Sequence, residues 1–298
     1  MKKWSGVFPA TTTQFASDER LDVAATQKVV DALIDDGVDG VICMGTVGEN
    51  CSLSAAEKRT VLAAVRETAG GRVPVLSGVA EYTTALAADY ARDAEKAGID
   101  GLMVLPAMVY KSNRRETLHH YRTVAQATGL PIMVYNNPVS YGVDITVDMF
   151  GELADLPNIV AIKESTEDTR RLTDLHRAHG DRFVLFAGVD DIVLESLMLG
   201  ASGWVSGLTN AFPRESVALY AHATAGRYAE ALAIYRWFMP LLHLDTIPTL
   251  VQCIKLAEQL VGRGSEMVRA PRLCLTGEER AWVETVVRDA VATRPKLS

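Results

Sequence analysis

A short pattern that recurs three times along the chain limits its possible folds more than any other feature. In each copy a helical stretch ends at a glycine, a second glycine follows three residues later, and an apolar run begins. The copies start at Gly37, Gly98 and Gly200. Glycine adopts the left-handed conformation at a helix end with little strain, and a short continuous apolar run is typical of a buried parallel strand. The pattern therefore predicts a repeated helix–strand unit.

Five further apolar runs bring the number of predicted strands to eight. The eight strands are expected near residues 7–8, 41–44, 74–78, 102–105, 131–135, 159–162, 183–187 and 204–205. Helical patterns fill the gaps, and capping-box sequences are expected to start helices at Ser54 and Asn113. Eight strands that alternate with helices predict an α/β fold of the (β/α)8, or TIM barrel, type. A doubly wound sheet is the alternative, but no G-x-G-x-x-G follows the first predicted strand.

The pattern changes after about residue 225, where only helical periodicity remains. A capping box at Thr276–Glu279 is expected to start the last helix. We therefore expect two parts, a catalytic barrel over residues 1–225 and a C-terminal helical extension over residues 226–298.

Composition excludes several classes of function. The 298 residues carry 30 Lys and Arg against 37 Asp and Glu, a net charge of −7, which repels phosphate backbones and argues against nucleic acid as a partner. No apolar run reaches the length of about 18 residues that a membrane span needs. The 4 cysteines lack the spacing of a metal site. We expect a cytoplasmic protein that binds neither nucleic acid, membrane nor metal.

The active site of such a barrel lies where the strands end, which draws attention first to Lys163. This lysine follows an apolar run, 160–162. Apolar surroundings favour the neutral amine, and a neutral amine can attack a carbonyl to form a Schiff base. The alternative is an ordinary lysine at the start of a loop, paired with Glu164.

Two further strand ends carry groups that suit this chemistry. Tyr135 ends the strand before that of Lys163, and a phenol there can move protons, although a purely structural tyrosine is the alternative. The Thr46 hydroxyl could hydrogen-bond this phenol and relay the proton. Gly45 and Gly48 bracket Thr46, and a turn of this kind can aim backbone N–H groups at a carboxylate.

These residues give the chain a resemblance to the dihydrodipicolinate synthase / N-acetylneuraminate lyase family of class I aldolases and lyases. The resemblance covers essentially the whole chain. It is carried by Gly-Thr-Val-Gly-Glu at 45–49, Tyr-Asn-Asn-Pro at 135–138, Lys-Glu at 163–164 and the segment 188–191. It implies that Lys163 attacks C2 of a small 2-oxo acid such as pyruvate, that no external cofactor is needed, and that the protein is a homotetramer.

The resemblance also implies roles for individual residues. Lys163, Tyr135, Thr46 and Tyr110 would be catalytic, with Tyr110 as a second relay tyrosine supplied across a subunit interface. The substrate would be bound at Thr46, Val47, Gly48, Ser140, Gly188 and Val205. The chain departs from the family at two of these positions, where Val47 lacks a hydroxyl and Ser140 replaces an arginine of the synthases. Serine cannot replace the bidentate carboxylate contact of arginine, which disfavours dihydrodipicolinate synthase activity.

The departures favour a lyase that degrades a hydroxylated 2-oxo acid or its cyclic imine. The resemblance is greatest to the Δ1-pyrroline-4-hydroxy-2-carboxylate deaminases of hydroxyproline breakdown. The alternative is an aldolase that releases pyruvate from a 2-keto-3-deoxy sugar acid or from 4-hydroxy-2-oxoglutarate. A non-catalytic 2-oxo acid sensor is a possibility from another class, but the chain keeps Lys163, Tyr135 and Thr46 together.

Overall fold

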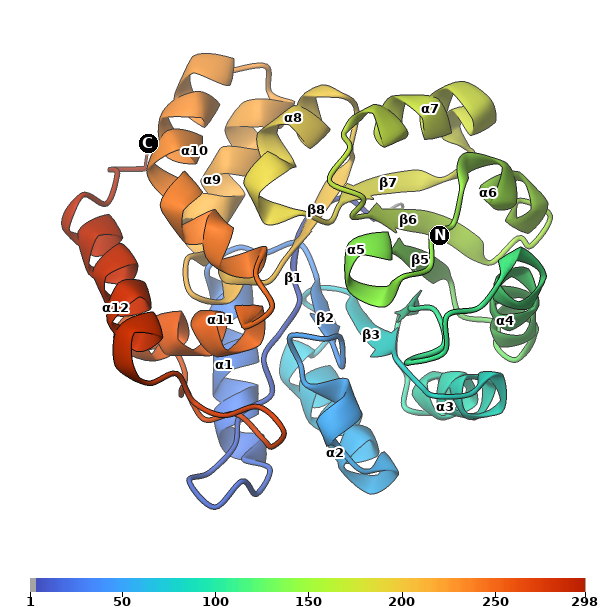
Figure 1. The fold of residues 1–298 in the computed structure, drawn as a ribbon, viewed down its shortest axis with the longest axis horizontal. Helices are drawn as coiled ribbons and strands as arrows, with labels where there is room; N and C mark the ends of the chain where they lie inside the picture. The colour runs from blue at the N-terminus through green and yellow to red at the C-terminus, as the bar shows by residue number, and fades with distance from the viewer. Residues whose placement is uncertain (1–3, 298) are drawn as a thin grey trace.

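A computed structural model describes residues 4–297 of the chain. Within them eight parallel strands form one sheet in the order β1-β8-β7-β6-β5-β4-β3-β2. The first and last strands of this order meet through a parallel bridge between Ala10 and Ile42, which nearly closes the sheet into a barrel. Helices surround the strands (Figure 1). The predicted (β/α)8 TIM barrel with a C-terminal helical extension is confirmed.

All eight predicted strands are present, with ends that differ from the predicted ones by only a few residues. They are β1 (Gly6–Pro9), β2 (Val41–Cys43), β3 (Val75–Val79), β4 (Gly101–Val104), β5 (Ile132–Asn136), β6 (Ile159–Glu164), β7 (Val184–Ala187) and β8 (Gly203–Ser206). Almost every strand residue is buried, because each strand has the barrel interior on one face and the helices on the other. This two-sided burial explains why the strands are continuous apolar runs.

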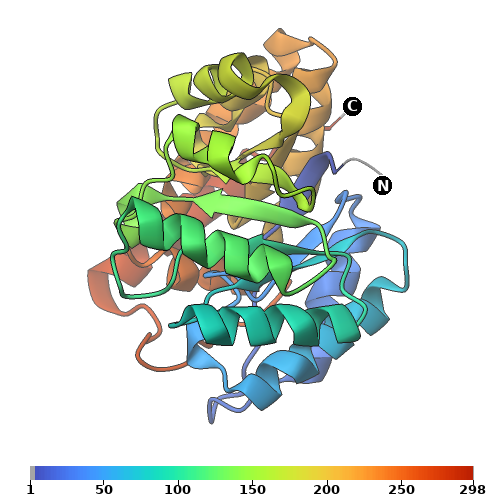
Figure 2. The ribbon, with the colours of Figure 1, turned by 90° about the vertical axis from the view of Figure 1, so that its right-hand side faces the viewer.

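The helices that cover the barrel are α1 (Val23–Asp35), α2 (Ala55–Ala69), α3 (Thr84–Lys96), α4 (Arg114–Gln126), α5 (Pro138–Tyr141), α6 (Val147–Leu153), α7 (Arg170–His179), α8 (Val193–Met198) and α9 (Pro213–Thr224). Figure 2 shows α2, α3 and α4 side by side on one flank. The chain continues with α10 (Tyr228–Leu242), α11 (Leu250–Leu260) and α12 (Gly277–Ala292). The division of the chain at residue 225 stays a prediction.

The recurring glycines have two different roles. The first glycine of each copy has a positive φ, +93° at Gly37, +74° at Gly98 and +99° at Gly200. The second glycine packs against an aromatic ring, and a β-carbon would come within 2.3 Å of that ring at Gly40 (Phe8), Gly101 (Trp4) and Gly203 (Phe186). The first glycine therefore ends the helix, whereas the second makes room for a ring.

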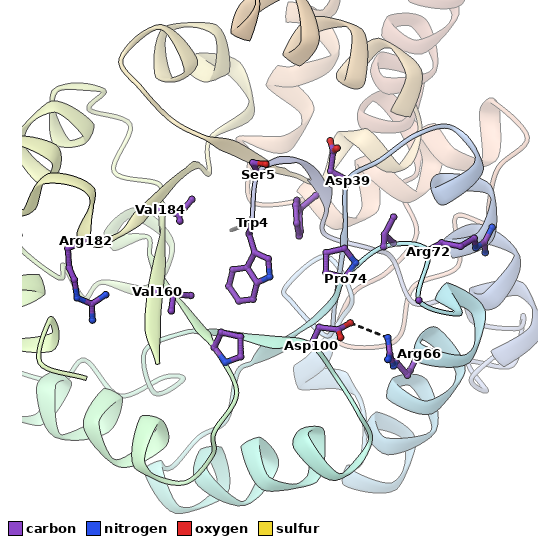
Figure 3. Close-up of a pocket in the computed structure, with 14 residues that line it drawn as sticks. Trp4, Ser5, Asp39, Arg66, Arg72, Pro74, Asp100, Val160, Arg182 and Val184 are labelled. Atoms are coloured by element: carbon purple, nitrogen blue, oxygen red, sulfur yellow. Dashed lines mark hydrogen bonds and ion pairs between the residues drawn. The ribbon is translucent and has the colours of Figure 1, made fainter. Parts of the chain in front are cut away.

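A cavity lies at the end of the barrel where the strands begin, opposite to the predicted site (Figure 3). Its carboxylates hold the starts of strands: Asp39 accepts a hydrogen bond from the Val7 N–H at 2.8 Å, and Asp100 accepts one from the Val75 N–H at 2.9 Å. Asp100 also pairs with Arg66 at 3.2 Å. These groups are committed to structural bonds, so we assign this cavity no chemistry.

Two of the three predicted capping boxes are confirmed. At both Ser54 and Asn113 the side chain accepts from the backbone of the glutamate three residues later, whose side chain bonds back. The capping box predicted at Thr276 is wrong, because the Thr276 side chain makes no cap hydrogen bond. Glu279 instead accepts a hydrogen bond from the Thr249 hydroxyl at 2.6 Å, so a tertiary contact replaces the local one.

Candidate active site

Lys163 lies on β6 inside the mouth of the barrel. Only 6% of its surface is exposed, and its Nζ lies 3.9 Å from the ring centroid of Tyr135, its register partner on β5. Lys163 forms no ion pair with a carboxylate of the described residues. Glu164 is instead bound by Asn136 Nδ2 at 3.2 Å and by the Thr166 N–H at 2.9 Å, and burial raises the pKa of Glu164. The pairing of Lys163 with Glu164, the structural alternative, is therefore not formed.

The end of β7 passes close to the stem of Lys163. A β-carbon at Gly188 would lie 2.8 Å from Lys163 Cγ and 2.1 Å from Ser165 Oγ. Only glycine allows this approach, so Gly188 shapes the wall beside Lys163. The Ser165 hydroxyl is buried and has no hydrogen-bond partner among residues 4–297. It lines a cavity at the mouth of the barrel that Lys163 also lines.

The asparagines of the Tyr-Asn-Asn-Pro motif hold the end of β5 in place. Asn136 is fully buried, and its Oδ1 accepts from the Ile145 N–H at 2.9 Å. Asn137 donates to the Tyr135 hydroxyl at 3.1 Å, while its Oδ1 accepts from the Ser140 N–H at 2.9 Å and caps the short helix α5. The motif therefore fixes the phenol of Tyr135 and turns the chain over the barrel mouth.

The turn after β2, where a nest of N–H groups is expected, leaves two N–H groups without an acceptor in the described part of the chain. The N–H groups of Thr46 and Val47 donate to no acceptor among the described residues, so they are available to an anion. Glu49, the last residue of the motif, adopts the left-handed conformation with φ of 53°. At Gly48 a β-carbon would lie 3.0 Å from both Met44 N and Thr11 O. Gly48 therefore supports the turn and does not itself line the cavity.

The hydroxyl partner of Thr46 differs from the expected one. Thr46 Oγ1 lies 2.5 Å from the hydroxyl of Tyr141, which ends α5, and makes no such contact with Tyr135. The rings of Tyr135 and Tyr141 meet edge to face with centroids 5.6 Å apart. Burial, and then the neighbouring Tyr135, raises the pKa of Tyr141. The expectation of a Thr46–Tyr135 bond is thus wrong, because α5 places a second phenol in that position.

A cavity of about 550 Å³ joins these groups. Its lining includes six residues predicted from the sequence: Thr46, Val47, Tyr135, Ser140, Lys163 and Gly188. Val205 is buried on β8 and does not line the cavity, whereas Gly207, two residues later, does. The roles of all these residues stay predictions.

Tyr110 lies apart from this cavity. It follows β4, is 59% exposed, and donates its hydroxyl to Glu116 at 3.2 Å. It lines a separate surface hollow with Thr84 and His119. Its proposed role requires a second subunit, so it stays a prediction.

The cavity lining also includes polar residues that were not predicted as site residues, among them Tyr141, Ser165 and Asp245. The signal for Ser165 was available, because it lies two residues after Lys163 at the same strand end. No local pattern marks Tyr141 or Asp245, since α5 and the C-terminal extension bring them to the barrel mouth.

Buried charges anchor the Gly-Thr-Val-Gly-Glu turn to α11. Lys255 is fully buried and donates to Glu49 Oε1 at 2.9 Å and to the Thr13 carbonyl at 2.7 Å. Burial lowers the pKa of Lys255. One turn further along α11, Glu258 is also fully buried. Its Oε1 accepts from the Thr12 hydroxyl at 3.0 Å, and its Oε2 has no partner among the described residues. These contacts hold the backbone on both sides of the turn in place.

Glu258 gives stability a defined pH dependence. Burial raises the pKa of Glu258 from 4.5 to about 7. The folded state therefore binds this proton more tightly than the unfolded state, and its contribution to stability is lost as pH rises from about 4.5 to about 7. Glu258→Gln mimics the protonated form. The wild type loses this contribution as pH rises, and the variant does not. We therefore expect the unfolding free energy of the variant, relative to that of the wild type, to increase by about 3 kcal/mol from pH 5 to pH 8. Urea unfolding at both pH values measures it, and a difference that does not change with pH contradicts the assignment.

Residues 4–297 contain neither a cluster of metal-ligating side chains nor a helix that could span a membrane. No three His, Cys, Asp or Glu side chains of this part of the chain lie close enough to hold a metal ion. None of its helices has the length and apolar character needed to cross a membrane.

Comparison with known proteins identifies the family. A model of the dihydrodipicolinate synthetase family matches residues 3–290. The 4-hydroxy-tetrahydrodipicolinate synthase of Nitrobacter hamburgensis is 34% identical over 289 residues, 97% of this chain and 96% of that protein. The corresponding protein of Methanospirillum hungatei is 33% identical over 271 residues, 90% and 93% of the two chains.

Solved structures support the same family assignment. The dihydrodipicolinate synthase of Bacillus anthracis superposes with a TM-score of 0.93 at 29% identity, covering 99% of this chain and 100% of that one. YagE of E. coli, solved in complex with pyruvate, has a TM-score of 0.91 at 28% identity, covering 97% and 99%. The chain therefore belongs to the dihydrodipicolinate synthetase family, and it is an enzyme of the class I Schiff-base lyase type.

Proposed function

We propose that the protein is a lyase that forms a Schiff base between Lys163 and a hydroxylated 2-oxo acid, or the cyclic imine of one. The preferred substrate is Δ1-pyrroline-4-hydroxy-2-carboxylate, which would be deaminated to 2-oxoglutarate semialdehyde and ammonia. Lys163 would attack C2, Tyr135 would move the protons, and the free N–H groups of Thr46 and Val47 would bind the carboxylate.

The charge of the cavity lining is the observation that carries this proposal. Lys163 is the only lysine or arginine among the described residues that line the cavity, whereas Glu167 and Asp245 contribute carboxyl groups. The position of the expected arginine is occupied by Ser140, and the Ser165 hydroxyl has no hydrogen-bond partner within residues 4–297. Such a lining suits one carboxylate held by the nest together with a neutral, hydroxyl-bearing remainder. It disfavours substrates with two carboxylates, 4-hydroxy-2-oxoglutarate included.

The names of the relatives favour a second candidate, because they are 4-hydroxy-tetrahydrodipicolinate synthases. Cleavage of a 2-keto-3-deoxy sugar acid is a third, since that reaction uses the same lysine and tyrosine. Parallel assays separate the three: ammonia release from the cyclic imine, pyruvate release from the sugar acid, and formation of 4-hydroxy-tetrahydrodipicolinate. We expect ammonia release to have the highest kcat/KM. A higher value for either other reaction rejects the proposed substrate.

Tyr135→Phe tests the role of the phenol. We expect kcat to fall by about 10²- to 10⁴-fold with little change in KM, because only proton transfer is removed. Steady-state kinetics measure this. Tyr82→Phe, at a tyrosine that is 56% exposed on the loop after β3, is the matched control. An unchanged kcat in Tyr135→Phe removes this residue from the mechanism.

The assembly and location are also proposals. Three residues are more than half exposed: Val109 and Tyr110 on the loop after β4, and Val139 on α5. An apolar surface of this kind is typical of a subunit contact, and we propose that it is buried in a homotetramer, which sedimentation velocity would detect. The cytoplasmic location stays a prediction.

A further inference from the structure

Two carboxyl groups meet at the wall of the cavity, and neither has a role in the mechanism proposed above. Asp190 begins the turn after β7, and Asp245 ends η5 (His243–Asp245), the short segment between α10 and α11. Asp245 accepts a hydrogen bond from the Gly207 N–H, and Asp190 accepts one from the N–H of the next residue, Leu208, so the two carboxyl groups lie close together. Two carboxyl groups buried this close together do not both ionise readily, so one of them holds a proton.

The surroundings of the two groups decide which one holds this proton. Asp190 is 1% exposed and is bound as an anion would be. Three donors reach its oxygens: Trp204 Nε1 at 2.9 Å, the Ser206 hydroxyl at 2.8 Å and the Leu208 N–H at 3.3 Å. Asp245 accepts only one hydrogen bond from the described residues, from the Gly207 N–H at 3.2 Å. The donors therefore stabilise Asp190 as the carboxylate, and Asp245 keeps the proton.

The electrostatics agree with this assignment. Burial raises the pKa of Asp245 well above its ordinary value, and the neighbouring charge of Asp190 raises it further. The charge of Lys163 opposes this rise. Asp245 therefore retains its proton under conditions in which an exposed aspartate is ionised.

Asp245 is also accessible to a substrate. It lines the cavity together with Lys163 and Tyr135. The other acidic residue of the lining, Glu167, is exposed to solvent. Asp245 is thus the one carboxylic acid of the described lining that a second carboxylate keeps protonated.

We propose that Asp245 is the general acid that protonates the leaving C4 hydroxyl of the substrate held on Lys163. The inference rests on the Schiff-base function proposed above and adds the residue that makes elimination, rather than aldol cleavage, the reaction of this site.

The step balances as follows. Tyr135, which gave its proton to the ring nitrogen when the ring opened, takes a proton from C3. This converts the imine to an enamine, in which the Lys163 nitrogen is bonded to C2. The nitrogen lone pair then forms N=C2, the C2=C3 electrons form C3=C4, and the C4–O bond breaks. The oxygen takes the proton of Asp245 and leaves as water. The new positive charge on the Lys163 nitrogen offsets the charge that Asp245 acquires, and solvent returns a proton to Asp245 after the product leaves.

Aldol cleavage would require the opposite protonation state of Asp245. It begins with removal of the proton from the C4 hydroxyl, which requires a base. An aspartic acid that already holds a proton next to an ionised Asp190 is a poor base and a suitable acid. The carboxyl pair therefore distinguishes two reactions that use the same lysine and tyrosine.

Asp245→Asn tests the proposal, because asparagine keeps the shape of the side chain but has no acidic proton. The substrates are Δ1-pyrroline-4-hydroxy-2-carboxylate and its 4-chloro analogue, and chloride leaves without protonation. We expect turnover of the hydroxyl compound to fall by about 10²- to 10⁴-fold, while turnover of the chloro compound stays within about threefold of the wild type. Asp245→Ser, which is also neutral, serves for the same comparison should the asparagine variant fail to fold.

Two controls separate the possible failures. Borohydride reduction with pyruvate should trap an adduct on Lys163 in the wild type and in Asp245→Asn alike. Absence of the adduct in the wild type rejects the proposed function itself. An adduct in both proteins, with equal loss on both substrates or with no loss on the hydroxyl compound, rejects the role of Asp245 alone. Asp191→Asn, a neighbouring carboxylate that pairs with His243 at 3.0 Å, should leave both rates unchanged.

Discussion

Replacement of Lys163 with alanine is expected to lower turnover of any substrate by a factor on the order of 10⁴ or more. The side chain is 6% exposed, forms no ion pair with a described residue, and faces the Tyr135 ring at 3.9 Å. The side chain therefore contributes little to the stability of the fold, and its replacement removes the nucleophile itself. Steady-state rates of the variant and the wild type, measured at saturating substrate, give the factor.

The control for this prediction is Lys96→Ala. Lys96 lies at the end of α3 with its side chain 77% exposed, so we expect the wild-type rate from this variant. Circular dichroism should show both variants folded. Equal rates for Lys163→Ala and the wild type would show that the enzyme does not use Lys163 as its nucleophile.

Replacement of Lys255 with methionine is expected to lower the free energy of unfolding by about 3 to 5 kcal/mol. Lys255 and Glu49 are both buried, and their ion pair spans 2.9 Å. Methionine fills a similar volume but leaves the Glu49 carboxylate without its buried counter-ion. Glu49 ends the turn that carries the Thr46 and Val47 N–H groups, so we also expect weaker binding of pyruvate. Urea unfolding measures the first effect and isothermal titration with pyruvate the second.

The double variant Lys255→Met/Glu49→Gln isolates the ion pair. It removes both charges, so we expect it to recover part of the stability lost in the single variant. A loss below about 1 kcal/mol in Lys255→Met contradicts the anchoring role, since it would place the pair among weak surface contacts.

The barrel was predictable because its signals are local. Each strand is a short apolar run, and glycines such as Gly37 and Gly98 mark where one unit ends and the next begins. The capping boxes at Ser54 and Asn113 were predictable for the same reason, since both partners lie within one helical turn. At Thr276 the same pattern misled, because Glu279 bonds to Thr249, a partner far away in the sequence.

The site was predictable only in part. Lys163 and Tyr135 lie at the ends of neighbouring strands, and parallel strands bring their carboxyl ends to one rim. Tyr141 and Asp245 reach the same rim from α5 and from the C-terminal extension. No periodicity relates these segments to β5 or β6, so their place depends on tertiary packing. Lys255 and Glu258 share the apolar face of α11, and the sequence alone does not reveal that Glu49 is the partner of Lys255.

Borohydride trapping shows whether Lys163 forms a Schiff base. The protein is incubated with pyruvate, reduced, digested, and analysed by peptide mass spectrometry, with Lys163→Ala treated in parallel. The account predicts a mass gain on the peptide that contains Lys163 in the wild type and none in the variant. An adduct on another lysine, or no adduct with pyruvate or with larger 2-oxo acids in a folded protein, would contradict it.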